Sequence, residues 1–128
     1  EFEGKPLYET LLVPTKLYQN DIFKIQEQVK LSGIAHITGG GLIENVPRII
    51  PNGLSAVVEK SNVNVPSLMK ELMKRGGIEE NEMFGTFNMG VGMVVICDES
   101  NAQNILNLIE GSMLIGTIEK GDEKITLR

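Results

Sequence analysis

The chain has 128 residues, the size of a single domain, and a domain of this length buries enough surface to fold without disulfide or metal staples. Its 12 Lys and Arg against 17 Asp and Glu give a net charge of -5, which argues against a general nucleic-acid binder because such proteins need a basic surface. The single cysteine, Cys97, cannot form an internal disulfide and indicates a reducing, cytoplasmic compartment, and no stretch has the length of a transmembrane helix or the pattern of a signal peptide.

Residues 1–20 predict a lead-in and a first strand. Residues 1–10 are polar, contain Gly4 and Pro6, and are expected to be extended. The run LLVPTKLY (residues 11–18) predicts a strand, and Pro14 restricts that strand to a sheet edge or a bulge because proline cannot donate to a ladder. The chain does not begin with Met, which indicates a processed chain or a piece of a longer one.

Residues 21–128 predict alternating helices and strands. A helix over 21–32, capped by Asn20 or Asp21, is followed by a strand over 33–38, a helix over 41–50 that Pro47 breaks near Asn45 or Val46, and a strand over 54–60. A helix over 66–77 begins at Pro66 and stops at Gly76 or Gly77.

The remaining elements continue this alternation. They are a short helical turn over 79–87, a buried strand over 90–98, a helix over 101–110 after a Ser100 cap, and two final strands over 112–120 and 124–128 around a Gly121–Asp122 turn. The alternation predicts an α+β domain, with a mixed sheet that carries helices on its faces and is related in part to the ferredoxin-like plan.

Three consecutive glycines, Gly39, Gly40 and Gly41, follow Thr38 between a predicted strand and a predicted helix. Backbone N–H groups and the helix dipole converge on anions in this arrangement, so a phosphate site is one interpretation; tight packing of a strand–helix corner is the preferred explanation of the glycines taken alone. The segment lacks the Lys-Ser/Thr of a P-loop and the spacing of a dinucleotide fingerprint.

His36, the only histidine, precedes Thr38 by two residues, so both side chains are expected on one face of the strand. Such a histidine is either a hydrogen-bonded core residue or a group that acts beside an anion. A second histidine and a cysteine pair are both absent, so the sequence predicts no zinc or iron site.

A second cluster places Asn88, Gly90 and Gly92 at strand alternation. The two glycines leave room either for a packed helix or for a ligand beside Asn88. The methionines of this half of the chain are expected to fill the core; they are Met69, Met73, Met89, Met93 and Met113.

Three strings of this sequence, AHITGGGLIENVPRIIPNGLSAVV, EMFGTFNMGVGMVV and LLVPTKLY, closely resemble the C-terminal domain of the aminoimidazole ribonucleotide synthetases, the phosphoribosylformylglycinamidine cyclo-ligases of purine biosynthesis. The resemblance runs over nearly all 128 residues. It implies a three-layer α/β/α domain, over residues 21–128, that closes the active-site groove of a two-domain, homodimeric enzyme. It also implies an N-terminal ATP-binding domain before residues 1–20, which holds Mg²⁺ and the dimer interface.

The resemblance further implies that ATP drives cyclisation of formylglycinamidine ribonucleotide to aminoimidazole ribonucleotide. The glycines then form the floor of the groove, where they approach a phosphate of substrate or nucleotide, and His36 either bonds that phosphate or moves a proton. Thr38, Asn45 and Asn88 become candidates for orienting the substrate. By itself the 128-residue chain is expected to bind no cofactor and to be inactive.

Two other interpretations remain open from the sequence. Other enzymes of the same superfamily share this architecture: formylglycinamidine ribonucleotide amidotransferase, thiamine-monophosphate kinase, selenophosphate synthetase and a hydrogenase maturation factor. A non-catalytic, ligand-binding α+β module is the alternative from a different class.

Overall fold

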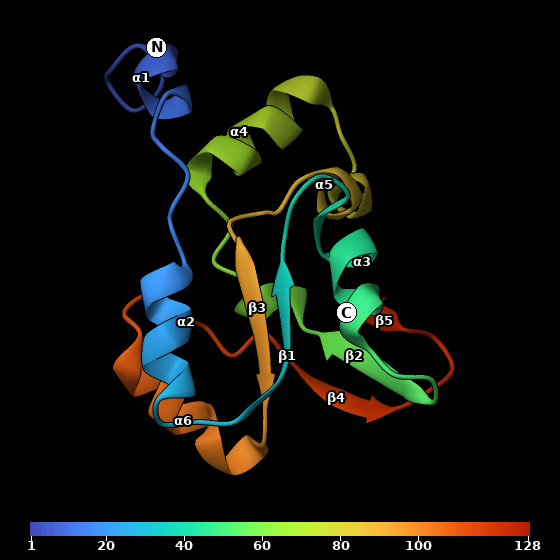
Figure 1. The fold of residues 1–128 in the computed structure, drawn as a ribbon. Coiled ribbons are helices and arrows are strands. Elements are labelled where there is room, and N and C mark those ends of the chain that lie inside the picture. The colour runs from blue at the N-terminus through green and yellow to red at the C-terminus, as the bar shows by residue number, and fades with distance from the viewer.

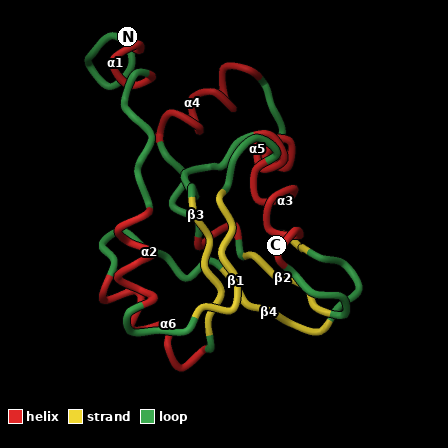
Figure 2. Tube along the Cα trace, in the orientation of Figure 1, coloured by secondary structure: helices red, strands yellow, loops and turns green.

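The computed structural model describes all 128 residues as helices packed around two small sheets (Figure 1, Figure 2). The elements are α1 (Leu7–Leu11), α2 (Gln19–Gln26), β1 (Leu31–His36), α3 (Gly41–Asn45), the 3₁₀ turn η1 (Val46–Ile49), β2 (Leu54–Val58), the 3₁₀ turn η2 (Lys60–Asn62), α4 (Ser67–Gly76), α5 (Glu80–Thr86), β3 (Met93–Cys97), α6 (Glu99–Leu108), β4 (Gly116–Lys120) and β5 (Ile125–Leu127). The predicted α+β class is confirmed.

The strands divide between two sheets. β1 pairs with β3 antiparallel, and β2 lies between an antiparallel β4 and a parallel β5, so the second sheet is mixed. The two predicted final strands are present but do not pair with each other. After β4 the chain passes Gly121, whose N–H donates to the Gly53 carbonyl, and then returns on the other side of β2.

The N-terminal prediction is wrong in two respects. Residues 1–10 are not extended throughout, because α1 begins at Leu7, and residues 11–18 form no strand. Pro14 interrupts this run, and no other strand lies beside it to pair with its backbone. Its apolar side chains therefore stay exposed, Leu12 at 75% and Leu17 at 88%.

Two predicted helix caps are also wrong. α2 is preceded by Tyr18 at the N-cap, and Asp21 lies in the first turn, where its carboxylate pairs with Lys16 at 2.9 Å. α6 is capped by Asp98, whose carboxylate accepts from the Ser100 N–H at 3.0 Å and the Ser100 hydroxyl at 2.6 Å. These two hydrogen bonds hold the pKa of Asp98 below its ordinary value.

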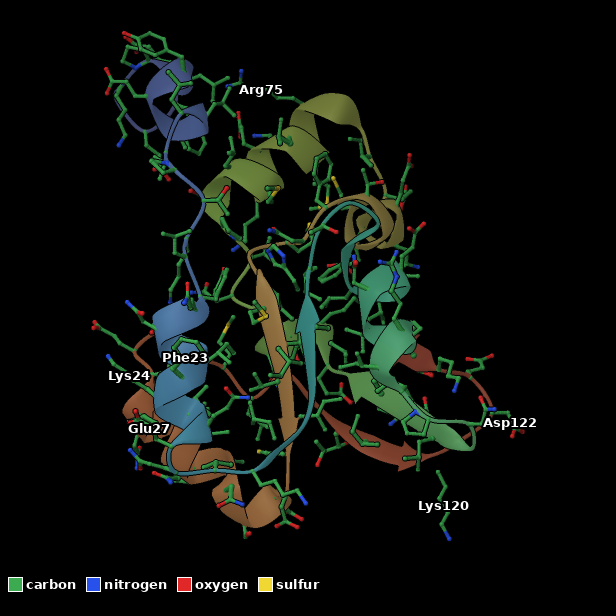
Figure 3. All side chains as sticks on the ribbon, viewed as in Figure 1. Phe23, Lys24, Glu27, Arg75, Lys120 and Asp122 are labelled. Atoms are coloured by element: carbon green, nitrogen blue, oxygen red, sulfur yellow. The ribbon has the colours of Figure 1, made fainter.

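The middle of the chain folds as its local signals indicate. α3 ends at Asn45 and η1 takes up Pro47, α4 follows Pro66, and Gly77 ends α4 in the left-handed conformation with a φ of 61°. Figure 3 shows Lys24 and Glu27 pointing away from the body of the domain, whereas Phe23 lines a hollow together with Ile34 of β1.

The core lies on both faces of the β1–β3 sheet. On one face, α2 and α6 bury a small cluster of Ile25, Val29, Ile105 and Ile109. On the other face, a larger cluster joins this sheet to β2, α3 and α5, and its fully buried side chains are Leu42, Met83, Phe84 and Met89. Met69, Met73 and Met113 pack against the larger cluster, so their predicted role as core filler is confirmed.

β3 differs from its prediction as a buried strand. All five of its residues are only half-buried, whereas four of the five residues of β2 are buried. The reason is that β3 has a partner strand on one side only.

Candidate functional site

The glycine loop, Thr38–Gly41, connects the end of β1 to α3. The Gly41 N–H donates to the Thr38 carbonyl at 3.1 Å, which closes a turn over the glycines. Gly40 has a φ of 89° and Gly41 a φ of 58°, a backbone region that favours glycine. The N–H groups of Gly39 and Gly40 donate to no backbone or side-chain acceptor within the chain. The loop therefore has two adjacent backbone donors without a partner in the chain, and the Glu44 side chain lies close to the second of them, Gly40.

Gly41 supports the interpretation that the glycines allow tight packing where β1 meets α3. A Cβ atom at this position would overlap the Phe84 carbonyl oxygen and would lie 2.5 Å from that of Phe87. Gly41 is therefore needed for the contact between α3 and α5. Gly39 is different, because a Cβ there would meet no atom within 4 Å.

Asn45 holds the loop from inside. Its side-chain amide is buried and donates to the carbonyls of Gly41 at 2.8 Å, Gly39 at 3.2 Å and Thr38 at 3.4 Å. The Thr38 hydroxyl donates to the Asn45 side-chain oxygen at 3.4 Å. These bonds fix the direction of the loop carbonyls, so Asn45 is placed to position the loop.

Asn88 lies in a tight turn directly after α5. The Val91 N–H donates to the Asn88 carbonyl at 2.9 Å, and both central residues of this turn have a positive φ, Met89 at 52° and Gly90 at 92°. Such values are those of a type I′ turn, which is unusual for methionine. The side-chain oxygen of Asn88 accepts from the Gly90 N–H at 3.0 Å, which leaves its amide group as the remaining donor.

The two predicted clusters are adjacent in space. The Ile37 N–H donates to the Gly92 carbonyl at 2.9 Å, which extends the β1–β3 pairing up to the glycine loop. Gly41 lies against the carbonyl of Phe87, the residue before Asn88. The segments around residues 36–41 and 87–92 thus lie together at one end of the β1–β3 sheet.

The space beside Gly90 and Gly92 is occupied by residues that precede helices. A Cβ on Gly90 would lie 2.6 Å from Pro66 Cδ, and a Cβ on Gly92 would overlap the Tyr18 hydroxyl. Pro66 is the N-cap of α4 and Tyr18 the N-cap of α2. Both glycines therefore allow a helix start to approach the sheet.

His36 is the last residue of β1 and is exposed to solvent. Its ring lies 6.4 Å from the Tyr18 ring, centroid to centroid, at an interplanar angle of 59°. Lys16 Nζ lies 5.4 Å from the centre of the same Tyr18 ring. His36 and Tyr18 also line one shallow hollow together with Met93, so His36 is a surface residue and not a core one.

The neighbourhood of His36 includes two residues that the sequence analysis did not select. Tyr18 and Lys16 were placed on a strand, but they lie in the approach to α2, beside the imidazole. The only local signal that could have identified them is a tyrosine and a lysine just before an amphipathic helical segment.

No group of three or more histidine, cysteine, aspartate or glutamate side chains lies close enough together to hold a metal ion. Helices long and apolar enough to cross a membrane are likewise not found.

The structure defines an α+β domain with a glycine-rich corner that presents two free backbone donors beside an exposed histidine. All of residues 1–128 match the family described as "AIR synthase related protein, C-terminal domain", and the chain belongs to this family.

Relatives named phosphoribosylformylglycinamidine cyclo-ligase are similar over almost the whole chain. The protein of Caldicellulosiruptor bescii is 43% identical over 98% of this chain and 38% of its own length. That of Citrifermentans bemidjiense is 44% identical over 93% of this chain and 35% of its own length. That of Fusobacterium nucleatum is 44% identical over 98% of this chain and 38% of its own length. The chain thus spans little more than a third of these relatives.

Proposed function

We propose that this domain is the groove-closing half of an ATP-dependent cyclo-ligase that converts formylglycinamidine ribonucleotide to aminoimidazole ribonucleotide in purine biosynthesis. The observation that carries the proposal is the pair of free N–H groups at Gly39 and Gly40, on the same end of the sheet as His36 and Asn88. The name of the relatives supports the same reaction.

In this proposal the glycine loop binds a phosphate of the substrate or of the nucleotide. Backbone N–H groups are suitable donors to phosphate oxygens because they add no side-chain bulk and need little reorganisation. α3 has only five residues, so the two free amides, and not a long helix dipole, supply the attraction. Asn45 acts as a positioning residue, since its amide fixes the loop carbonyls inward.

The side chains around the loop orient the substrate. His36 donates to the phosphate, a contact we favour over proton transfer because the neighbouring amides already favour an anion there. The free amide group of Asn88 supplies a further donor, and the Thr38 hydroxyl, which donates to Asn45, is left to accept from a substrate hydroxyl. Their contribution to the rate is positioning, which lowers the entropic cost of ring closure.

When bound, ATP supplies the activation step: it phosphorylates the formamide oxygen, which leaves as phosphate when the amidine nitrogen closes the ring, with ADP as the other product. The described residues do not fit Mg²⁺, because they offer no carboxylate cluster. We therefore assign Mg²⁺, most of the ATP contacts and a homodimer interface to an N-terminal domain of a longer, cytoplasmic protein.

The test is a steady-state assay of ATP-dependent cyclisation in the longer protein. His36→Gln should lower kcat/KM about ten-fold or more, about 1.4 kcal/mol of transition-state stabilisation, mainly by raising KM. Ser32→Gln, an exposed change on the same strand, is the matched control. Full activity of a folded His36→Gln enzyme would refute the role of His36.

A second arm tests the division of labour between the domains. The 128-residue chain by itself should show no cyclisation above the blank, because it offers no site for Mg²⁺. Turnover by this chain would contradict the proposed assignment of ATP and Mg²⁺.

A further inference from the structure

The outer edge of β3 is unpaired. β3 is hydrogen-bonded to β1 on one side, and no strand lies on its other side. The Ile37 N–H donates to the Gly92 carbonyl, so Gly92 and Val94 face β1. Because antiparallel ladders alternate, the backbone N–H and C=O groups of Met93 and Val95 point to the open edge.

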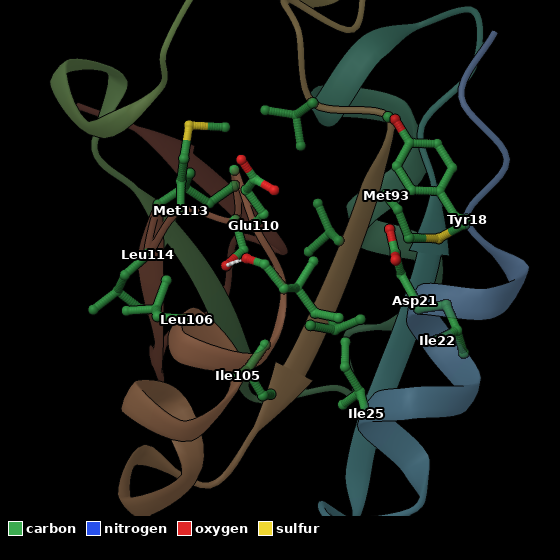
Figure 4. Close-up of a pocket in the computed structure, with 18 of the residues that line it drawn as sticks. Tyr18, Asp21, Ile22, Ile25, Met93, Ile105, Leu106, Glu110, Met113 and Leu114 are labelled. Atoms are coloured by element: carbon green, nitrogen blue, oxygen red, sulfur yellow. Dashed lines mark hydrogen bonds between the residues drawn. The ribbon is translucent and has the colours of Figure 1, made fainter.

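A groove runs along this edge, which we call the β3 groove (Figure 4). It encloses about 310 Å³, and 15 of its 22 lining residues are hydrophobic. α2 supplies one wall, and α6 with the loop that follows it supplies the other. Figure 4 shows Ile25 of α2 and Ile105 of α6 at one end of the groove, and Leu106 and Leu114 along the far wall.

β3 contacts apolar side chains on both faces, because Val94 and Ile96 pack against the larger core cluster and Val95 and Cys97 against the smaller one. Its sequence, MVVIC, is apolar throughout, a pattern typical of strands covered on both faces. All five residues are nevertheless half-buried, and Leu114 on the groove wall is 56% exposed. Unpaired backbone groups beside apolar walls are what an added strand would cover.

We propose that the β3 groove receives an extended segment of the same polypeptide, from the part that precedes Glu1 in the longer protein, and that this segment adds to β3 as a third strand. The proposal rests on the proposed function only in taking this domain as the C-terminal part of a longer chain. The family description and the one-third span of the relatives favour that source of the segment.

The shape of the groove favours a single strand over a second copy of the domain. α2 and α6 pack on the same face of the β1–β3 sheet, and their side chains line the groove beside the open edge of β3. A second copy would have to bring an edge recessed in the same way to within about 5 Å, the spacing of paired strands, and its own helices would obstruct the approach. A lone extended segment does not meet this obstruction.

The test is amide hydrogen exchange in the longer protein, read at Met93 and Val95 against Val94 in the same strand. If a strand covers the edge, the three amides should exchange at rates within about ten-fold of one another. Met93 and Val95 exchanging about 100-fold faster than Val94 would overturn the proposal, whatever the cyclisation activity of the same sample.

Two variants of the longer protein identify what lies in the groove. Leu114→Lys places a charge on the groove wall and should accelerate exchange at Met93 and Val95. Ile118→Lys, on β4 and outside the groove, is the matched control and should leave both amides unchanged. Equal effects of the two variants would contradict the proposal. Protection that disappears as dilution separates protomers would assign the edge to a second copy and would also overturn it.

Discussion

Replacing Gly41 with alanine tests the packing of the glycine loop most severely. Gly41 has a φ of 58°, which costs an alanine about 1–2 kcal/mol. The new methyl group would also overlap the Phe84 carbonyl and crowd that of Phe87, so α5 must move away from α3. Overpacking of this kind typically costs about 1–3 kcal/mol, which brings the expected loss to roughly 3 kcal/mol.

The matched control is Gly39→Ala in the same loop. A Cβ at Gly39 meets no atom within 4 Å, so this change should alter the free energy of unfolding by less than about 0.5 kcal/mol. The assay is urea unfolding of the purified chain, followed by circular dichroism, with the slope of the transition compared among the three proteins. A Gly41→Ala protein as stable as Gly39→Ala would refute the reasoning from Cβ geometry.

Three further predictions concern single polar side chains. Asn45→Ala removes the side-chain donor to the carbonyls of Gly39 and Gly41 together with a buried side chain, and should cost about 1–2 kcal/mol by urea unfolding; a loss below about 0.5 kcal/mol would contradict its positioning role. Asp98 has a lowered pKa, so its stabilisation is present above the ordinary aspartate pKa and is lost as pH falls through the lowered value; Asp98→Ala should flatten the acid side of a plot of stability against pH, and an unchanged plot would exclude the cap. Burial, and then the charge of Asp98, raise the pKa of the Cys97 thiol, so alkylation at pH 8.5 should be slower in the folded chain than in urea, and equal rates would contradict this.

Local signals predicted the elements whose ends are encoded nearby. Pro66 and Gly77 bracket α4, and Pro47 ends α3 at Asn45, because each residue constrains its own backbone. The cap of α6 was misplaced by two residues since Asp98 and Ser100 both have capping side chains, and only the structure shows which of them accepts the N–H.

Non-local pairing could not be predicted in the same way. The apolar run around Leu12 has the composition of a strand, but a strand needs a partner, and no other strand lies beside this run. The position of β5 beside β2 depends on the path of the chain after Gly121. Neither feature leaves a local pattern in the sequence.

The candidate site was predicted only where its residues carry a local signal in the sequence. The glycine loop and Asn88 were selected from their own residues, but the predicted strand alternation of Asn88, Gly90 and Gly92 is wrong, because Asn88 and Gly90 lie in a turn before β3. The contact of Gly41 with Phe84 and the ring of Tyr18 beside His36 arise only when distant segments meet. The roles of His36, Thr38, Gly39, Gly40, Gly41, Asn45 and Asn88 toward a substrate stay predictions.

The most direct test of phosphate binding by the glycine loop is an amide spectrum of the longer protein, labelled with ¹⁵N on glycine only and titrated with formylglycinamidine ribonucleotide. The Gly39 and Gly40 signals should move in a saturable way, because their N–H groups are the free donors of the loop. Gly53 and Gly111, which have positive φ and open surroundings, are the internal controls and should not move. Saturable binding that leaves Gly39 and Gly40 unchanged, or moves all four glycines alike, would contradict the proposed phosphate site.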